Sequence, residues 1–370
     1  MRENVKYYQE DNYAQLVRTV DLKKDFTNND FVYVDEFAYD FLWRVQLKEP
    51  NIVLPNIGAN IGEKYYVSPK DLPKEKNVLG PNAILLRSKC NDTHFVYFRL
   101  STSSYDNEMK KLVGASGQPK FNKTDLKKVR LFIPSLKEQK KISYFLGLLE
   151  ERIATQNKII EDLKKLKSAI IEKVFNGKHS EKLQLNDVGS YIRGLTYSSN
   201  DVVEHGGTLV MRSNNIINGS LLDYNNNVVF VNKQMSAEQQ LQNGDVVICM
   251  ANGSSSLVGK SSFYDGSCHS PITVGAFCGI YRSKEPIVKW LFQTNKYRRY
   301  IWNSLQGGNG AIANLNGEDI LNMSFSIPNA TIKDTCVKML TSMDSALENN
   351  MSLCALYTLQ KQYLLRQMFI

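Results

Sequence analysis

PSLKEQKKISYFLGLLEERIATQNKIIEDLKKLKSAIIEKVF, residues 134–175, is the stretch that decides the fold. It contains one glycine and no proline after Pro134. The spacing along its seam alternates between four and three residues, at positions Ile142, Leu146, Leu149, Ile153, Gln156, Ile160, Leu163, Lys167, Ile170 and Val174. This period predicts one helix that buries a narrow seam against a second helix, with a length of roughly 60 Å at about 1.5 Å per residue.

Both ends of the stretch carry the residue types that begin and end helices. Ser135 is a candidate N-cap with Glu138 three residues on, and Pro134 lies just before it. Asn176 and Gly177 favour the left-handed conformation that closes many helices. We therefore expect the helix to end near residue 175.

The same pattern occurs again 194 residues later, without a gap. Ile133–Pro134 corresponds to Ile327–Pro328. The second seam is Cys336, Leu340, Met343, Leu347, Asn350, Cys354, Tyr357, Lys361, Leu364 and Met368. The fifth and eighth positions of both seams are polar. Two helices that share even their polar interruptions indicate an internal duplication.

The duplication extends upstream of each helix. Arg18 aligns with Arg212 and Gly114 with Gly308 at the same offset, although the match between these anchors is looser. Each unit is therefore predicted to be a variable α+β domain followed by a long helix. The predicted boundaries are 1–134 for the first globular domain, 135–176 for its helix, 177–328 for the second domain and 329–370 for the second helix.

Strand and turn signals divide the globular parts further. Apolar runs on either side of Gly- and Asn-rich turns predict hairpins within residues 51–67 and 246–264. Other expected elements are a strand that enters a loop over Gln15–Leu22, strands over Val129–Ile133 and Gly275–Tyr281, and a helix over Val288–Leu305.

The composition is typical of a globular protein without a membrane span. Hydrophobic residues make up 42% of the 370 positions, and no run of 18 apolar residues occurs. The first six residues are mostly polar and lack the apolar core of a signal peptide. The six cysteines form no Cys-x-x-Cys pair, which favours free thiols in a reducing cytoplasm.

The net charge of +9 is concentrated in two clusters. Residues 110–141 hold ten Lys or Arg against two acidic residues, and residues 282–299 hold six against one. Both clusters come shortly before a predicted long helix. Clustered positive charge favours a polyanion such as DNA, since neutralising phosphates releases counterions, but it is also compatible with an ordinary solvated surface.

The motifs that would indicate catalysis are weak. Gly253 and Gly259 precede Lys260, but five residues separate the glycines where a P-loop needs four, and the stretch is predicted to be a hairpin. The four histidines are scattered, so no metal site is expected. The sequence therefore indicates no catalytic centre and no cofactor.

Polar loops at matching places in the two units are the better candidates for function. Asn, Gln, Arg and Lys can read base edges or hold phosphates, although Asn, Gly and Ser also simply form turns. The candidate DNA-binding residues are Arg18, Asn56, Asn60, Lys64, Lys110, Lys111, Gln118, Lys120, Arg212, Asn214, Asn215, Asn252, Ser254, Lys260, Arg298, Arg299 and Asn309.

This pattern resembles the specificity (S) subunits of type I restriction-modification systems. The residues that carry the resemblance are Pro134, Glu138, Gln139 and Ile142, whose spacing Pro-x-x-x-Glu-Gln-x-x-Ile is similar to the motif that opens the family's central helix. A glycine loop before each helix, at residues 114–117 (the first glycine loop) and 307–310 (the second glycine loop), and the duplicated unit also fit, so the resemblance covers nearly the whole chain. The second copy departs from the motif, with Thr331–Asp334 in place of the Glu-Gln element.

The resemblance implies two target recognition domains, each of which reads half of a split sequence in double-stranded DNA. The two helices would form an antiparallel coiled coil that sets the spacing between the half-sites, in a pseudo-two-fold layout. Methylation subunits, two in number, would dock on the helices, and they and the restriction subunits would carry the chemistry. The implied location is the cytoplasm of a prokaryote.

Two points stay open at the level of sequence. The second unit has residues 183–194 before its Arg212 strand, and the first domain is expected to lack the counterpart of this opening segment. A sheet edge of the first domain would then be unpaired. The alternative function is a non-catalytic scaffold whose helices dimerise and whose globular parts bind proteins, although such a scaffold does not need basic and glycine-rich loops at the same place in both units.

Overall fold

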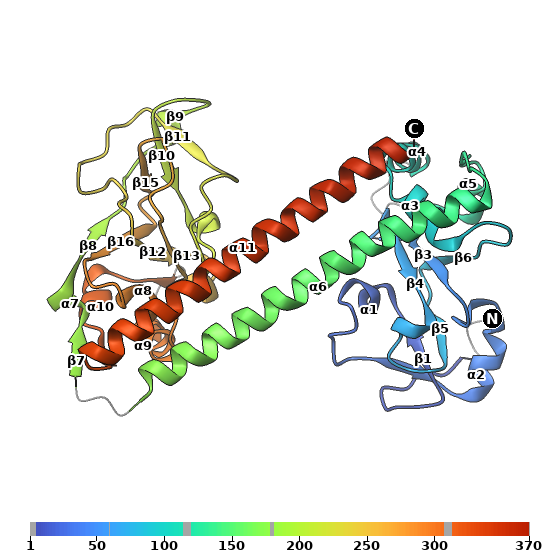
Figure 1. Cartoon of the computed structure of the whole chain (residues 1–370), viewed down its shortest axis with the longest axis horizontal. Helices are drawn as coiled ribbons and strands as arrows, with labels where there is room; N and C mark the ends of the chain where they lie inside the picture. The colour runs from blue at the N-terminus through green and yellow to red at the C-terminus, as the bar shows by residue number, and fades with distance from the viewer. Residues whose placement is uncertain (1–4, 59, 114–119, 178–180, 307–312, 370) are drawn as a thin grey trace. The chain divides into compact units, whose positions relative to one another are not determined.

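The computed structural model describes residues 5–58, 60–113, 120–177, 181–306 and 313–369. The chain divides into two compact units, which are described separately below. Unit 1 comprises residues 1–157 and 352–370, and unit 2 comprises residues 158–351. The fold is mixed, with small sheets, short helices and two long helices (Figure 1).

The two predicted long helices are confirmed as α6 (Leu136–Phe175) and α11 (Ala330–Met368). The Ser135 hydroxyl accepts a hydrogen bond from the Glu138 backbone N–H at 3.4 Å, as expected of an N-cap. Ten apolar residues of the two predicted seams are buried or half-buried: Ile142, Leu149, Ile153, Ile160, Leu163, Leu340, Met343, Leu347, Tyr357 and Leu364. No helix in the described part of the chain is long and apolar enough to cross a membrane.

Unit 1 contains two three-stranded sheets, ordered β2-β1-β5 and β4-β3-β6. Its strands are β1 (Ala14–Val17), β2 (Val32–Val34), β3 (Asn51–Pro55), β4 (Tyr65–Val67), β5 (Asn77–Leu79) and β6 (Ala83–Leu86). Its short α-helices are α1 (Thr19–Lys23), α2 (Glu36–Phe41), α3 (Thr93–Leu100), α4 (Ser103–Leu112) and α5 (Lys123–Leu126). The strand β3 is buried along its whole length, and α3 and α4 supply much of the core beside it.

Unit 2 is built on the same two sheet orders with strands added. Its sheets are ordered β15-β10-β11-β9, β14-β12-β16-β8, β18-β7 and β13-β17. The strands are β7 (Glu181–Gln184), β8 (Gly189–Arg193), β9 (Val202–Val203), β10 (Thr208–Met211), β11 (Val229–Val231), β12 (Val246–Cys249), β13 (Ala251–Asn252), β14 (Ser261–Phe263), β15 (Ile272–Val274), β16 (Cys278–Ser283), β17 (Ala313–Asn314) and β18 (Ser324–Ile327). The helices are α7 (Leu185–Val188), α8 (Val288–Leu291), α9 (Asn295–Gln306) and α10 (Gly317–Leu321).

The strand partners match between the two units. The strand β1 pairs antiparallel with β2 and parallel with β5, while β10 pairs antiparallel with β11 and parallel with β15. The predicted hairpins are both present, because β3 pairs antiparallel with β4, and β12 with β14. In unit 1, β6 pairs only with β3 among the described strands, whereas its counterpart β16 has β8 on its other edge.

Four predicted elements differ from the structure. The strand predicted to enter a loop over Gln15–Leu22 ends at Val17 and is followed by a helix instead of a loop, because the Asp21 carboxylate accepts the Arg18 backbone N–H at 2.8 Å and opens α1. The segment 129–133 forms no strand, whereas β18 in unit 2 has β7 to share its backbone hydrogen bonds. Of the strand predicted over Gly275–Tyr281, only the part from Cys278 onward belongs to a strand, while Gly275 forms an isolated parallel bridge with Leu195. The helix predicted over Val288–Leu305 is two helices, since the Thr294 hydroxyl caps α9 by accepting the Tyr297 N–H at 3.1 Å.

Candidate nucleic-acid interface

In unit 2, three loop segments that are far apart in sequence lie together. The Asn252 side-chain amide donates to the Ser213 hydroxyl at 3.3 Å, which joins the turn after β10 to the loop after β12. The strand β13 pairs antiparallel with β17, which directly follows the second glycine loop in sequence. The structure therefore brings together two of the loops that the sequence predicted as candidates.

Unit 1 has the corresponding arrangement. Ile57 forms an isolated antiparallel bridge with Lys120, which directly follows the first glycine loop in sequence. The Asn56 side chain donates to the Phe121 carbonyl at 3.1 Å, so the loop after β3 is tied to this segment. The Lys23 ammonium in α1 donates to the side-chain amide oxygen of Asn60 at 3.0 Å and joins α1 to the same loop.

Several predicted residues are committed to contacts inside the protein. The Arg18 guanidinium pairs with the buried Asp21 at 2.7 Å and with Asp30 at 3.5 Å, and the hydrogen bonds that it donates to Asp21 raise the pKa of Arg18. The Lys64 ammonium pairs with Asp106. Cations that already have a carboxylate partner gain less from a phosphate, because part of their charge is neutralised.

The predicted asparagines likewise include one side chain that is bound inside the protein and one that is exposed. Asn215 is buried, and its NH2 group donates to the carbonyls of Asp223 and Asn226 at 3.0 and 2.8 Å. Its carbonyl oxygen accepts the Arg212 backbone N–H at 2.9 Å, so this side chain holds the turn. Asn214 next to it is exposed.

Most of the other predicted cations have no carboxylate partner among the described residues. Arg212 is exposed, and its guanidinium donates to the Asn227 carbonyl at 3.2 Å. The exposed members of this set are Lys110, Lys111, Lys120, Arg298 and Arg299, and Lys260 is half-buried. Ser254 is exposed and shares a hydrogen bond with Ser256 at 2.8 Å. Gln118 and Asn309 lie outside the described residues.

A hollow of about 470 Å³ lies between the loop 255–260 and α9 in unit 2. Lys260, Arg298 and Trp302 are among its lining residues, and 66% of the Trp302 surface is exposed. An exposed indole beside cations is a platform on which a nucleobase can stack. Sequence reasoning omitted Trp302 from the candidate site, although its place four residues after Arg298 on an amphipathic helix was the available signal.

The loop beside this hollow is held by a buried tyrosine. The Tyr297 hydroxyl donates to the Gly259 carbonyl at 2.7 Å, and burial raises the pKa of Tyr297, so the phenol stays a donor. Gly259 has a φ of +79°, and a Cβ there would lie 2.7 Å from Ile301. The glycine therefore serves the close approach of this loop to α9, in a hairpin and not in a phosphate-binding turn that opens a helix.

The described residues contain no group of three or more His, Cys, Asp or Glu side chains placed to hold a metal ion. The chemistry that the loops offer is hydrogen bonding, stacking and neutralisation of phosphate charge.

Comparison with known proteins agrees with this arrangement. Residues 8–165 match the family model of the type I restriction modification DNA specificity domain. The chain is 33% identical over 158 residues to the type I restriction enzyme EcoKI specificity subunit of Escherichia coli, which covers 40% of this chain and 31% of that protein. It is 32% identical over 156 residues to the StySPI specificity subunit of Salmonella potsdam, again covering 40% and 31%. The aligned segment thus spans about a third of the length of these relatives.

The fold extends the similarity beyond the aligned sequence. The type I restriction-modification S subunit from M. genitalium matches with a TM-score of 0.58 and 15% identity, over 87% of this chain and 83% of that one. A structure of a type I restriction-modification assembly matches with a TM-score of 0.50 and 12% identity, over 100% of this chain and 92% of the other. Neither kind of match favours the alternative of an unrelated scaffold. Residues 8–165 are thus similar in sequence to the DNA specificity domain of type I restriction-modification systems, and the chain shares its fold with solved S subunits of such systems.

Proposed function

We propose that this chain is the sequence-specific DNA-binding subunit of a type I restriction-modification complex and has no catalytic activity of its own. The observation that carries the proposal is the loop arrangement found in both units. In each unit, the loop after the central strand is tied to the segment that follows the glycine loop, through the Ile57–Lys120 bridge in unit 1 and the β13–β17 pair in unit 2. Cations that have no carboxylate partner among the described residues accompany both arrangements.

We further propose that the two units are copies of one ancestral unit and that each reads one half of a bipartite target. The matching strand partners support the duplication. A second support is a pair of ionic contacts that recur with their partners exchanged: Lys167 with Asp344 in unit 2, and Lys361 with Glu150 in unit 1. At the offset of 194 residues, Lys167 is equivalent to Lys361 and Glu150 is equivalent to Asp344. An isologous two-fold relationship produces such an exchange, because the lysine of each copy then contacts the acid of the other copy.

The same exchange supports an antiparallel coiled coil of α6 and α11. In unit 1, residues before position 158 of α6 contact the end of α11, as in the hydrogen bond of 3.1 Å from Arg152 to the Tyr357 hydroxyl. In unit 2, the later part of α6 contacts the early part of α11, as in the Lys167–Asp344 pair. A coiled coil of fixed length would set the spacing between the two half-sites.

Exposed apolar residues on the long helices support docking of methylation subunits, one on each copy, with restriction subunits joining through the complex. In unit 1, a hollow of about 820 Å³ on the helices is lined by Phe145, Leu148, Leu353 and Tyr357, among others. Phe145 and Leu148 are 47% and 46% exposed. Large apolar side chains exposed together mark an interaction surface. The proposed location is the prokaryotic cytoplasm, where these subunits would meet the DNA.

Methylation mapping tests the proposal. Genomic DNA from cells that supply the cognate methylation subunits is compared with and without this chain. A new methylated motif of two short blocks with a fixed gap is the expected result. A one-block or symmetric motif would contradict reading by both units. Absence of new methylation from an assembled complex would contradict the proposed function.

A further inference from the structure

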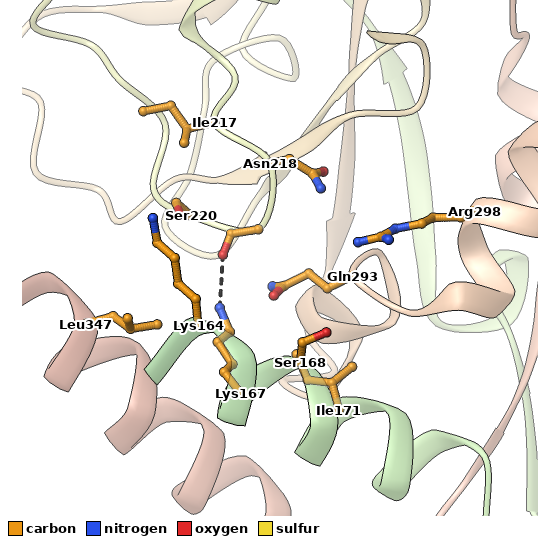
Figure 2. Close-up of a pocket in the computed structure, with 11 residues that line it drawn as sticks. Lys164, Lys167, Ser168, Ile171, Ile217, Asn218, Ser220, Gln293, Arg298 and Leu347 are labelled. Atoms are coloured by element: carbon orange, nitrogen blue, oxygen red, sulfur yellow. Dashed lines mark hydrogen bonds between the residues drawn. The ribbon is translucent and has the colours of Figure 1, made fainter. Parts of the chain in front are cut away.

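We propose that a second, smaller hollow in unit 2 is a binding site for one phosphate group of the DNA backbone. This inference rests on the proposed DNA-binding function and extends it to the long helix α6. The hollow has a volume of about 220 Å³ and lies between α6, the loop 217–220 and the segment 293–298 (Figure 2). None of the loop residues or α6 residues that line it was among the candidates from sequence.

The lining is cationic. Lys164, Lys167 and Arg298 line the hollow, and no Asp or Glu does. In Figure 2 the Arg298 side chain extends toward the hollow from α9, while the two lysines extend from α6. Lys164 and Arg298 are exposed and have no carboxylate partner among the described residues. Two uncompensated cations on one hollow favour an anion as its occupant.

Lys167 has a different role, because its positive charge is already paired with a carboxylate. Its ammonium lies 2.6 Å from the Asp344 carboxylate and donates to the Gly219 carbonyl at 2.9 Å. Gly219 has a φ of +73°, and its N–H donates to the Ser261 carbonyl at 2.9 Å. These contacts fix the loop 217–220 against α6, so the wall of the hollow is set before any ligand arrives.

Neutral polar side chains complete the lining. The Asn218 carbonyl oxygen accepts the Ser261 N–H at 3.2 Å, which leaves the Asn218 NH2 group to donate to a ligand. Ser168 and Gln293 also line the hollow. Arginine, lysine and neutral amide or hydroxyl donors are the groups that hold phosphate oxygens in protein–DNA complexes.

The size and position of the hollow indicate which ligand it binds. Its volume is below the range of roughly 300–1,000 Å³ that is usual for pockets holding drug-sized molecules, so a single phosphate fits better than a whole nucleotide. Arg298 and Asn218 also line the larger hollow that contains Lys260 and Trp302. The phosphate site is therefore continuous with the candidate nucleic-acid interface. A phosphate held there would link α6 to the globular part of unit 2.

The test compares salt dependence in matched variants of the full-length chain. Binding of a mixed-sequence DNA duplex is measured by fluorescence anisotropy over a range of salt concentrations. Lys164→Gln and Arg298→Gln should each make the slope of log affinity against log salt less steep by about 0.9, the value for one phosphate contact. Arg298→Lys keeps the charge and should restore most of the slope.

Lys165→Gln is the matched control. Lys165 is the next residue on α6, lies outside the hollow and pairs with Glu161 at 3.8 Å, so its replacement should leave the slope unchanged. Equal slopes for wild type, Lys164→Gln and Arg298→Gln would overturn the phosphate site while leaving DNA binding intact. If the wild-type chain binds no DNA, the proposed function itself fails.

A second experiment distinguishes between a phosphate of the DNA backbone and free inorganic phosphate as the ligand of the hollow. Inorganic phosphate is added at matched ionic strength, and thermal unfolding is followed in wild type and in Lys164→Gln. Stabilisation of wild type alone, with unchanged DNA slopes in the variants, would assign the hollow to free phosphate and overturn the DNA assignment. Reduced DNA slopes in the variants, with or without phosphate stabilisation, support it.

Discussion

The Lys167 ammonium lies 2.6 Å from the Asp344 carboxylate, and both side chains are almost completely buried. Asp344 also receives the Lys289 ammonium at 3.1 Å and the Trp290 indole N–H at 3.1 Å. One carboxylate thus ties α6, α8 and α11 together within unit 2. This contact explains why a lysine, Lys167, can occupy the eighth position of a largely apolar seam, since a buried ammonium needs a carboxylate beside it.

Asp344→Asn should destabilise unit 2 strongly. The change leaves the Lys167 ammonium buried without its counter-charge, and breaking a buried ion pair in this way costs about 3–5 kcal/mol. Chemical denaturation monitored by circular dichroism measures the loss in unfolding free energy. The double variant Lys167→Met/Asp344→Leu removes both charges and should recover much of it. A loss below about 1 kcal/mol in the single variant would contradict a structural role for this pair.

Glu150→Gln should remove a pH-dependent part of the stability of unit 1. Burial opposes ionisation of Glu150, but the hydrogen bond from His94 and the Lys361 ammonium 2.5 Å away outweigh it, and the pKa of Glu150 lies below its ordinary value. A depressed carboxyl pKa stabilises the fold above the unfolded-state pKa of about 4.3, and this stabilisation is lost as pH falls through the folded-state pKa. Urea midpoints of wild type and variant should therefore differ at neutral pH and converge in acid. A constant difference across this range would contradict the assignment.

Gly259→Ala should destabilise the loop that forms the larger hollow. The positive φ disfavours any side chain, and the added methyl would lie 2.7 Å from Ile301 on α9. We expect the free energy of unfolding to fall by about 1–3 kcal/mol. DNA binding should also weaken, because the shifted loop would move Lys260 away from Arg298. Gly253→Ala is the control, since a Cβ there meets nothing within 4 Å and Gly253 has no positive φ. Equal stability and affinity of both variants would contradict the close packing of this loop.

The pair Lys110→Gln/Lys111→Gln should weaken DNA binding by unit 1 without changing which sequence is preferred. Both lysines are exposed in the last turn of α4, and neither has a carboxylate partner among the described residues. Phosphate contacts position a protein on DNA but carry no direct sequence information, so the salt slope should fall by up to about 1.8. Lys74→Gln serves as a control for the loss of a lysine charge elsewhere in unit 1, because Lys74 already pairs with Asp11 at 2.5 Å. A changed methylation motif in the double variant would indicate base reading instead.

The sequence by itself determined the features that depend on nearby residues. The helices α6 and α11 follow from a seam period that is repeated 194 residues apart, and the termini of α6 follow from Pro134, Ser135 and the glycine after Asn176. Both hairpins follow from Gly- and Asn-rich turns between apolar runs. The resemblance to specificity subunits rested on the same local signals, since turns, caps and seams are encoded within a few residues of one another.

Only the tertiary structure decided which polar residues are available for a ligand. Arg18 and Arg212 occupy matching positions in the sequence, yet Arg18 is held by two carboxylates and Arg212 is exposed. Lys361 finds its acid 211 residues away, at Glu150. The hollow that brings Lys164 to Arg298 likewise joins distant segments. Charge compensation is a matter of a few ångströms in space, and a single sequence does not specify which distant side chains come that close.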